Sequence, residues 1–194
     1  MKNNDILQIQ FLNKIECDQV IEYSNDMEKY LLENETDNFS RITTKYFYKY
    51  NFFRDNPQYI DRFLKIIKKE LPELKFPIAV QSWVNIYRKN EGIEAHNHSG
   101  YPLYSYSANI FLGGPTNPGI TYFEPKNSIT IPNVMGELQI FNCGHWHEVV
   151  PNQTDEKRYS VGITFHSYEA ITQHILKNCC YNTIDSSVIL LRDN

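Results

Sequence analysis

The sequence lacks any long apolar run. A membrane-spanning helix needs roughly 18 or more consecutive apolar residues, so we expect no transmembrane helix and no membrane partner. The first residues, MKNNDILQIQFL, also lack the apolar stretch and the small-residue cleavage site of a secretory signal. These absences favour a cytoplasmic location.

Cysteine is scarce, with four among 194 residues, and no two of the four form a CxxC pair. Metal and redox sites commonly use that spacing. Cys17 and Cys143 stand alone, and the adjacent Cys179 and Cys180 cannot readily form a disulfide with each other. We interpret all four as reduced thiols, which also favours the cytoplasm.

An excess of basic residues is absent as well. Lys and Arg total 19 against 23 Asp and Glu, so the net charge is -4. Proteins that bind nucleic acid normally carry a basic patch or a high pI. A nucleic-acid partner is therefore not expected. The sequence leaves the oligomeric state open.

Internal repeats and low-complexity linkers are missing too, which predicts one domain over residues 1–194. Alternation at 6–12 predicts a short strand. Apolar spacing at 14–33 predicts an amphipathic helix or two helices. A Tyr-rich stretch at 44–50 is a candidate strand, and 57–71 predicts a helix that begins with proline.

From residue 79 the chain changes to short segments rich in β-branched and aromatic residues, separated by Gly, Pro and Asn. Such segments predict strands. They are residues 79–87, 104–112, 119–125, 128–132, 136–142, 147–151 and 158–166. So many short strands favour a sandwich or barrel, and the fold class is mainly β with flanking helices (α+β). We expect helical support from 1–78, a β core at 79–167, and a helix and strand within 168–194.

Three histidines of the β region are candidate metal ligands. His96 and His98 are two residues apart, and such residues project to the same side of a strand. His147 follows several predicted hairpins, which can return the chain to the same place. Imidazoles bind Fe, Zn, Cu or Ni. The His-x-His pair by itself is equally compatible with surface histidines.

Arg158 and Ser160 share one face of a predicted strand. A guanidinium fork and a hydroxyl suit a carboxylate. A buried arginine needs such an anion, because an unpaired buried charge is costly. For the arginine alone, the simpler interpretation is an exposed side chain paired with Asp155 or Glu156.

The order of these motifs within residues 83–165 resembles the non-haem iron, 2-oxoglutarate-dependent oxygenases. It is most similar to their small phage and bacterial branch, which is distantly related to prolyl hydroxylases. The matching motifs are Trp-x-Asn at Trp83 and Asn85, His-x-His at His96 and His98, Ser-small-x-aromatic from Ser107, Gly-x-x-x-Phe from Gly119, Gly-x-Leu-x-x-Phe from Gly136, His147 before Pro151-Asn152, and Arg-x-Ser at Arg158 and Ser160.

The resemblance implies a double-stranded β-helix (a jelly-roll, cupin-like barrel) with N-terminal helices packed outside. It implies an Fe(II)- and 2-oxoglutarate-dependent dioxygenase that uses O2 to hydroxylate an amino acid, a peptide or a small metabolite. The implied metal ligands are His96, His98 and His147. The implied cosubstrate residues are Arg158, Ser160, Tyr87 and Asn109. The aromatic residues expected at the substrate pocket are Tyr101, Tyr104, Tyr106 and Trp146.

The metal site departs from the family's pattern at one position. The usual site has two histidines and one carboxylate, and the carboxylate stands where this chain has His98. Either three histidines bind the metal, or Glu94 or Glu148 contributes. Halogenating relatives carry a small residue at this place, so halogenation is not expected.

Two other functions remain open. One is a cupin-like metal-binding jelly-roll protein, including a zinc-dependent hydrolase or isomerase. Against it, Pro102 and Leu103 stand where the cupin signature has a glutamate. The other is an inactive oxygenase fold that serves as an interaction module, an option that the missing carboxylate keeps open.

Overall fold

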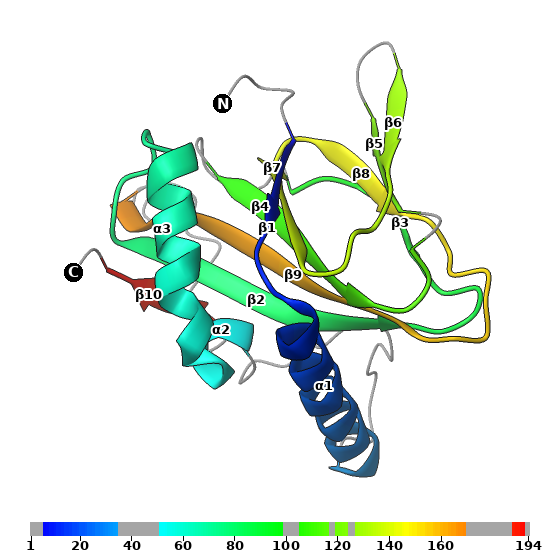
Figure 1. Cartoon of the computed structure of the whole chain (residues 1–194). Coiled ribbons are helices and arrows are strands. Elements are labelled where there is room, and N and C mark those ends of the chain that lie inside the picture. The colour runs from blue at the N-terminus through cyan, green and yellow to red at the C-terminus, as the bar shows by residue number, and fades with distance from the viewer. Residues whose placement is uncertain are drawn as a thin grey trace.

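The computed structural model describes residues 6–34, 51–98, 105–116, 119–123, 127–169 and 188–192. Within them the chain forms β1 (Leu7–Gln10), α1 (Lys14–Asn34), α2 (Phe52–Asp55), the short 3-10 turn η1 (Pro57–Tyr59), α3 (Ile60–Glu70), β2 (Ile78–Tyr87), β3 (Ile93–His96), β4 (Tyr106–Gly113), β5 (Ile120–Phe123), β6 (Ser128–Ile131), β7 (Glu137–Asn142), β8 (Trp146–Val149), β9 (Arg158–Ser167) and β10 (Val188–Leu191) (Figure 1).

The strands form two antiparallel sheets. The larger sheet has the order β1-β7-β4-β9-β2-β10, and the smaller has the order β3-β8-β5-β6. Residues of both sheets line one cavity, so the sheets face each other across it. This is the double-stranded β-helix expected from the sequence, and the predicted fold class is confirmed.

The two faces of the larger sheet differ in chemistry because side chains alternate along each strand. On β9, Val161, Ile163 and Phe165 belong to the hydrophobic core. The alternate positions Arg158 and Ser160 carry polar side chains toward the smaller sheet. The period-two pattern of this strand therefore separates an apolar outer face from a polar interior.

Helices cover the outer face of the larger sheet. Figure 1 shows α2 and α3 lying across this sheet, away from β5 and β6. Phe63 of α3 packs its ring against Phe165 of β9 at a centroid distance of 5.4 Å. Phe63, Leu64 and Ile67 are buried along α3, as its apolar spacing predicts. The expectation that N-terminal helices pack outside the β core is confirmed.

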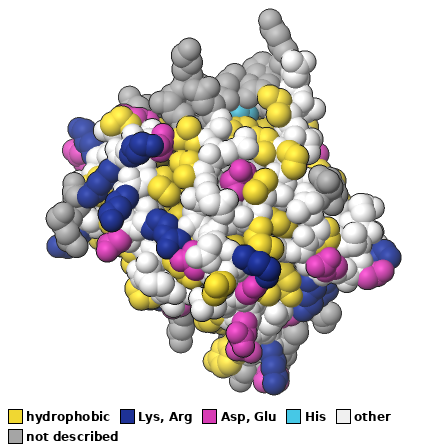
Figure 2. Space-filling view, viewed as in Figure 1, with side chains coloured by type: hydrophobic (Ala, Val, Ile, Leu, Met, Phe, Trp, Pro, Cys, Tyr) yellow, Lys and Arg dark blue, Asp and Glu magenta, His cyan; other side chains and the backbone are white. Residues whose placement is uncertain are grey.

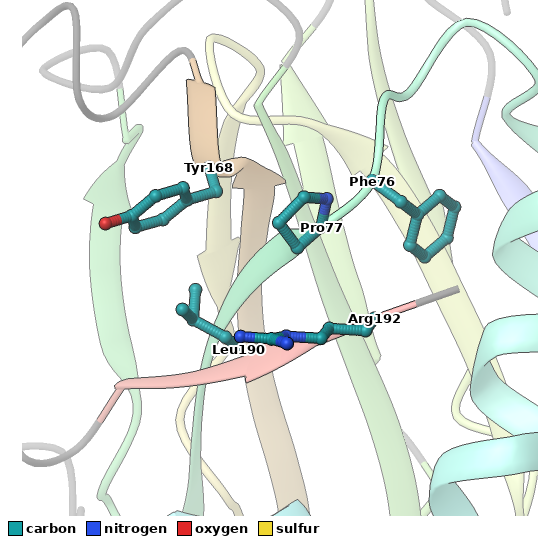
Figure 3. A pocket seen from close by; sticks show the side chains of 5 residues that line it. All are labelled: Phe76, Pro77, Tyr168, Leu190 and Arg192. Atoms are coloured by element: carbon teal, nitrogen blue, oxygen red, sulfur yellow. The ribbon is translucent and has the colours of Figure 1, made fainter. Parts of the chain in front are cut away.

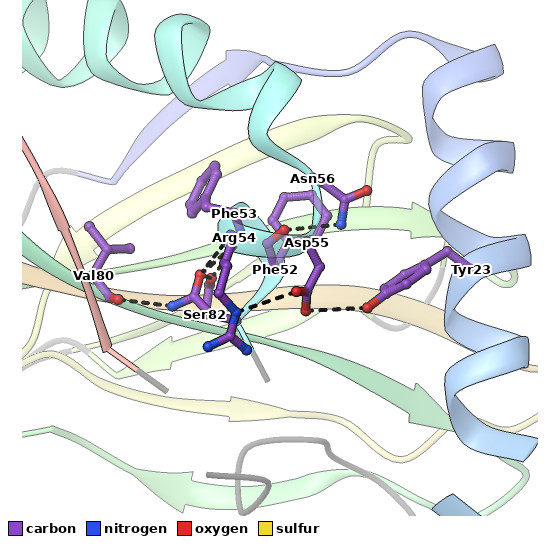
Figure 4. Close-up of polar contacts among 9 residues, drawn as sticks. Tyr23, Phe52, Phe53, Arg54, Asp55, Asn56, Val80 and Ser82 are labelled. Atoms are coloured by element: carbon purple, nitrogen blue, oxygen red, sulfur yellow. Dashed lines mark hydrogen bonds and ion pairs between the residues drawn. The ribbon is translucent and has the colours of Figure 1, made fainter. Parts of the chain in front are cut away.

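Figure 4 shows the start of α2 beside Val80 and Ser82 of β2, and the side chain of Asn51 connects the two elements. Its side-chain oxygen caps the helix by accepting from the backbone N–H of Phe53 at 3.0 Å and of Arg54 at 3.3 Å. The same side chain donates to the carbonyl of Val80 on β2 at 3.0 Å and accepts from the Ser82 hydroxyl at 2.8 Å. One buried amide thus satisfies the helix start and ties it to β2.

The face drawn in Figure 2 carries charged side chains of both signs. Lys and Arg side chains gather on its left side, and Asp and Glu side chains lie next to several of them. Among the described helices, none has the length and apolar character needed to cross a membrane.

Several predicted elements can be compared directly. The strand β1 confirms the strand predicted at 6–12, and α1 confirms a helix at 14–33 as one helix rather than two. The strand β10 confirms the strand predicted near the C-terminus. Cys17 and Cys143 are free thiols. The candidate strand at 44–50, the rest of the helix predicted after residue 168, and Cys179 and Cys180 lie outside the described residues. The division into 1–78, 79–167 and 168–194 stays a prediction.

Candidate functional site

Three histidines converge on the inner side of the smaller sheet. His96, the last residue of β3, is the register partner of His147 on β8, and their ring centroids lie 4.3 Å apart. The His98 ring lies 5.2 Å from that of His96 and 5.4 Å from that of His147. One ligand nitrogen from each ring lies within 4.8 Å of the others. Small ring rotations bring such a set onto one metal ion, whose bonds to nitrogen are about 2.1 Å long.

Backbone carbonyls fix the orientation of two of these rings. His96 Nδ1 lies 2.8 Å from the carbonyl oxygen of Glu94, and His147 Nδ1 lies 3.0 Å from that of His145. Because a carbonyl only accepts, each Nδ1 carries the hydrogen and donates it. In a neutral ring Nε2 then keeps its lone pair, which is the arrangement that metal-binding histidines use.

His98 completes the cluster although it lies beyond the end of β3. Its backbone N–H donates to the Cys143 carbonyl at 2.7 Å, which ties it to the turn before β8. Glu94 is exposed, and Glu148 alternates with His147 and so points to the other face of β8. Among the described residues, the structure therefore brings together three histidines and neither of those carboxylates. Their role as ligands stays a prediction.

Aromatic side chains enclose His147, which is 6% exposed. Phe141 meets its ring edge-on at 4.7 Å, and Tyr122, its register partner on β5, stacks at 6.2 Å. The Tyr122 hydroxyl donates to Gln139 on β7 at 2.8 Å, and burial raises the pKa of Tyr122 far above its ordinary value. This packing limits the rotation of the imidazole. Sequence reasoning missed Tyr122 and Phe141, because their contacts come from two different sheets.

Arg158 is buried, with 1% of its surface exposed. It opens β9, and its Nη2 donates to the carbonyl of Val150 at 2.7 Å. The guanidinium lies over the ring of Tyr87, its register partner on β2, at 4.7 Å from the ring centroid. Burial lowers the pKa of Arg158, while Tyr87 opposes that effect. The alternative of an exposed arginine is wrong, and Asp155 instead contacts Lys89 at 3.1 Å.

The polar groups next to Arg158 are buried and incompletely satisfied. Burial raises the pKa of Tyr87 to about 12, although Arg158 and Ser160 both lower it. Its hydroxyl has no hydrogen bond of normal geometry. Asn85 reaches Ser160 through a long contact of 3.5 Å, and its Oδ1 is buried without a partner. Buried polar atoms in folded proteins nearly always have partners, so such a cluster indicates a place for a ligand.

One cavity joins the histidines to these polar groups. Its walls include Trp83, Asn85, Tyr87, Ile93, His96, His98, Ser107, Asn109, Ile120, Phe141, His147 and Val149. Tyr87 and Asn109 both line this cavity, and their role at the cosubstrate stays a prediction. The indole of Trp83 lies directly over β9, because a Cβ at Gly162 would stand 2.6 Å from it.

The cavity is narrow in this conformation. Its volume of about 40 Å³ suits an ion or a water molecule, but not a five-carbon acid. Wall side chains must therefore move when a larger ligand enters. Trp83 and Tyr87 are the largest side chains on the wall formed by β2.

The substrate-pocket prediction is wrong for Tyr106. Its ring stacks on Phe165 at 5.7 Å and its hydroxyl donates to Glu73, on the helix-covered face. Alternation along β4 gives the inner face to Ser107 and Asn109 instead, and aromatic character alone does not reveal which face a residue takes. Trp146 is 51% exposed and alternates with His147. Tyr101 and Tyr104 lie outside the described residues.

A second hollow lies away from the histidines, where β10 meets the start of β2. Phe76, Pro77, Tyr168, Leu190 and Arg192 line it (Figure 3). Its walls come from the outer edge of the larger sheet rather than from its interior. It shares no lining residue with the histidine cavity.

Comparisons with known proteins extend this picture. No protein-family model matches the chain, and no curated protein matches its sequence. A non-heme α-ketoglutarate-dependent carbocyclase of nogalamycin biosynthesis is 12% identical, with a TM-score of 0.62, over 86% of this chain and 81% of its own. A Pseudomonas putida prolyl-4-hydroxylase is 18% identical, with a TM-score of 0.55, over 84% and 92%.

A third similar structure is a viral collagen prolyl hydroxylase from Paramecium bursaria chlorella virus-1, solved with 2OG. It is 14% identical, with a TM-score of 0.57, over 84% of this chain and 95% of its own. At identities of 12–18%, these likenesses establish the fold. At the level of the fold, these structures confirm the resemblance that the motifs indicated. The chain has the double-stranded β-helix fold of the iron- and 2-oxoglutarate-dependent oxygenases.

Proposed function

We propose that this protein is an Fe(II)- and 2-oxoglutarate-dependent dioxygenase that hydroxylates a small molecule or a peptide. One observation carries the proposal: a three-imidazole cluster and a buried arginine belong to the same barrel interior. Tyr87 links them, because its ring contacts Arg158 and also lines the histidine cavity. Two of the similar structures named above are an α-ketoglutarate-dependent carbocyclase and a prolyl hydroxylase solved with 2OG.

The donor set fits a metal ion of this type. His96, His98 and His147 would hold the iron, and imidazole nitrogens suit Fe(II) as well as zinc, copper and nickel. The two carbonyl acceptors at Nδ1 keep Nε2 of His96 and His147 in the form that binds metal. Three neutral ligands leave the ion's charge uncompensated, so the centre favours an anionic ligand such as a keto acid.

Once wall side chains have moved, the groups around Tyr87 at the polar end of the cavity would suit the far carboxylate of 2-oxoglutarate. Arg158 would bind it, with Ser160 and the protonated Tyr87 hydroxyl as further donors and Asn109 at the wall. A pKa of about 12 keeps Tyr87 a hydrogen-bond donor at neutral pH. The orphaned Oδ1 of Asn85 needs a donor that a carboxylate lacks, so it would accept from water or from the substrate.

Iron and 2-oxoglutarate, held by the three histidines and Arg158, would supply the oxidising chemistry: overall, 2-oxoglutarate, dioxygen and a substrate C–H bond would give succinate, carbon dioxide and a hydroxylated substrate. The chain's own side chains position these reactants. The metal side of the cavity has an apolar wall that would exclude water, and it is formed by Trp83, Ile120 and Phe141.

Turnover of 2-oxoglutarate tests the proposal without knowledge of the substrate. Metal-free protein would receive Fe(II), 2-oxoglutarate and air, and succinate formation and oxygen consumption would be measured. We expect slow succinate formation that depends on iron and is lost in His147→Ala. Absence of succinate although iron binds would contradict the assignment as an active dioxygenase.

A second function is favoured by one observation, the imidazole of His98 at the place of the usual carboxylate. It is a metal-binding jelly-roll protein without oxygenase activity, including an inactive module that binds a partner. In that case Zn(II) or Ni(II) would bind at the three histidines, and 2-oxoglutarate would neither bind nor turn over. The same succinate assay, combined with metal titration, separates the two functions.

A further inference from the structure

Asn152 lies in the loop between β8 and β9 and is completely buried. Its side-chain amide is fully used within the protein. Nδ2 donates to the carbonyls of Tyr87 at 3.1 Å and Glu156 at 2.7 Å. Oδ1 accepts from the backbone N–H and the hydroxyl of Thr154, both at 3.1 Å. Since no group of this amide remains for a ligand, its contribution has to be structural or positional.

The backbone of Asn152 joins its loop to the turn that follows β2. Its N–H donates to the carbonyl of Glu91 at 2.9 Å, and its own carbonyl accepts from the N–H of Asn90 at 2.7 Å. The two backbones touch nearby, because a Cβ at Gly92 would stand 2.4 Å from the Val149 carbonyl oxygen. The loop therefore cannot shift against β2 without breaking buried hydrogen bonds, which are costly to leave unmade.

These bonds surround Arg158. Val150, two residues before Asn152, supplies the carbonyl that accepts from the Arg158 guanidinium at 2.7 Å. Glu156, two residues before Arg158, is bonded to the Asn152 side chain. Tyr87 is bonded through its carbonyl to the same side chain and contacts the guanidinium with its ring. One amide thus ties together the chain segments that fix both ends of the arginine.

We infer that Asn152 is a positioning residue that sets the guanidinium of Arg158 at the distance from the metal that suits a five-carbon dicarboxylate. The inference rests on the proposed function. Asn152→Asp removes both Nδ2 donations and faces two carbonyls with a carboxylate. Arg158 then moves, while the histidines remain on their strands. A keto acid with a far carboxylate loses affinity, whereas one without it does not.

Two ligands and three proteins test this. Full-length wild type, Asn152→Asp and Gln153→Ala would be loaded with Fe(II) without oxygen and titrated calorimetrically with 2-oxoglutarate and with pyruvate, which chelates metal but has no far carboxylate. Gln153 is the matched control, an exposed neighbour whose amide donates only to Pro151. We expect Asn152→Asp to weaken 2-oxoglutarate binding roughly tenfold and to leave pyruvate binding unchanged. Gln153→Ala should change neither.

Equal 2-oxoglutarate affinity in Asn152→Asp and wild type would overturn the inference. Equal weakening of both ligands would overturn it too, because it would show a general effect on the fold. If Asn152→Asp does not fold, Thr154→Val decides in the same way: it removes the hydroxyl contacts to Asn152 and to the Glu156 carbonyl and should weaken 2-oxoglutarate binding alone. If wild type binds pyruvate as tightly as 2-oxoglutarate, the proposed cosubstrate fails, independently of Asn152.

Discussion

Arg158→Lys should weaken 2-oxoglutarate binding and leave metal binding unchanged. A guanidinium offers five N–H donors in a planar fork. One Nη2 hydrogen of Arg158 goes to the Val150 carbonyl at 2.7 Å. The fork can hold this loop and a carboxylate at the same time, and the single ammonium of lysine cannot reproduce both contacts.

The size of the effect follows from the bonds lost. A guanidinium–carboxylate pair makes two charge-assisted hydrogen bonds, each contributing about 1.5–3 kcal/mol. Arg158 is 1% exposed, so salt and water screen the pair little. Lysine keeps the charge and one bond, which predicts a Kd raised roughly 10- to 100-fold. Alanine keeps neither bond, which predicts a Kd raised on the order of 100- to 10,000-fold.

Calorimetric titration of 2-oxoglutarate into the Fe(II)-loaded protein without oxygen measures this Kd, and a separate titration measures iron affinity. Lys157→Ala is the control, because this neighbouring cation contacts Glu28 at 2.8 Å and not the cavity. An unchanged Kd in Arg158→Lys would refute the direct contact. A similar loss in Lys157→Ala would show that general charge, and not the fork of Arg158, attracts the dicarboxylate.

Three further predictions concern the metal, the cavity wall and pH. His98→Ala should weaken Fe(II) binding by at least roughly tenfold while His98→Asp retains it, as metal titration would show; an unchanged affinity in the alanine variant excludes His98 as a ligand. In a Trp146→Phe background, 2-oxoglutarate should change the fluorescence of Trp83, because the cavity of about 40 Å³ must open; a constant spectrum during binding contradicts this. Burial lowers the pKa of His166 to about 4. The contribution of the neutral His166 side chain to the free energy of unfolding is therefore fully present above its unfolded pKa of about 6.5. It is lost as the pH falls toward 4, by up to about 3 kcal/mol. Urea unfolding at pH 7 and pH 4.5 should show that the free energy of unfolding falls less in His166→Gln than in wild type. An equal fall in both proteins would show that His166 is not the source of this pH dependence.

The sequence predicted the parts of the site that local patterns encode. Period-two alternation located most of the strands, and His96, His98 and His147, which the motifs singled out, lie close together in the structure. Arg158 and Ser160 share a face of the strand because they stand two positions apart, and the structure buries both. Spacing alone left the His-x-His pair equally compatible with surface histidines and favoured an exposed Arg158. The resemblance carried by the order of the motifs pointed to an interior site, and the roles of these residues stay predictions.

The remainder depends on contacts between distant segments. Tyr106 was expected at the pocket, but a shift of one residue along a strand changes the face, and aromatic residues occupy both faces here. The sequence shows Asn152 only as the last residue of the motif that begins at His147, because its bonds to Tyr87 and to the turn after β2 join segments far apart in the chain. The enclosure of His147 by Tyr122 likewise needs the register of β5 and β8.

The most direct test of the account is the visible spectrum of the anaerobic protein with Fe(II), before and after addition of 2-oxoglutarate. Chelation of ferrous iron by a keto acid gives a weak metal-to-ligand charge-transfer band. We predict that the band appears in wild type and is lost, at the same ligand concentration, in both His147→Ala and Arg158→Ala. If iron binds and no band appears at any 2-oxoglutarate concentration, the three-histidine centre is not a 2-oxoglutarate site, and the proposed function is wrong.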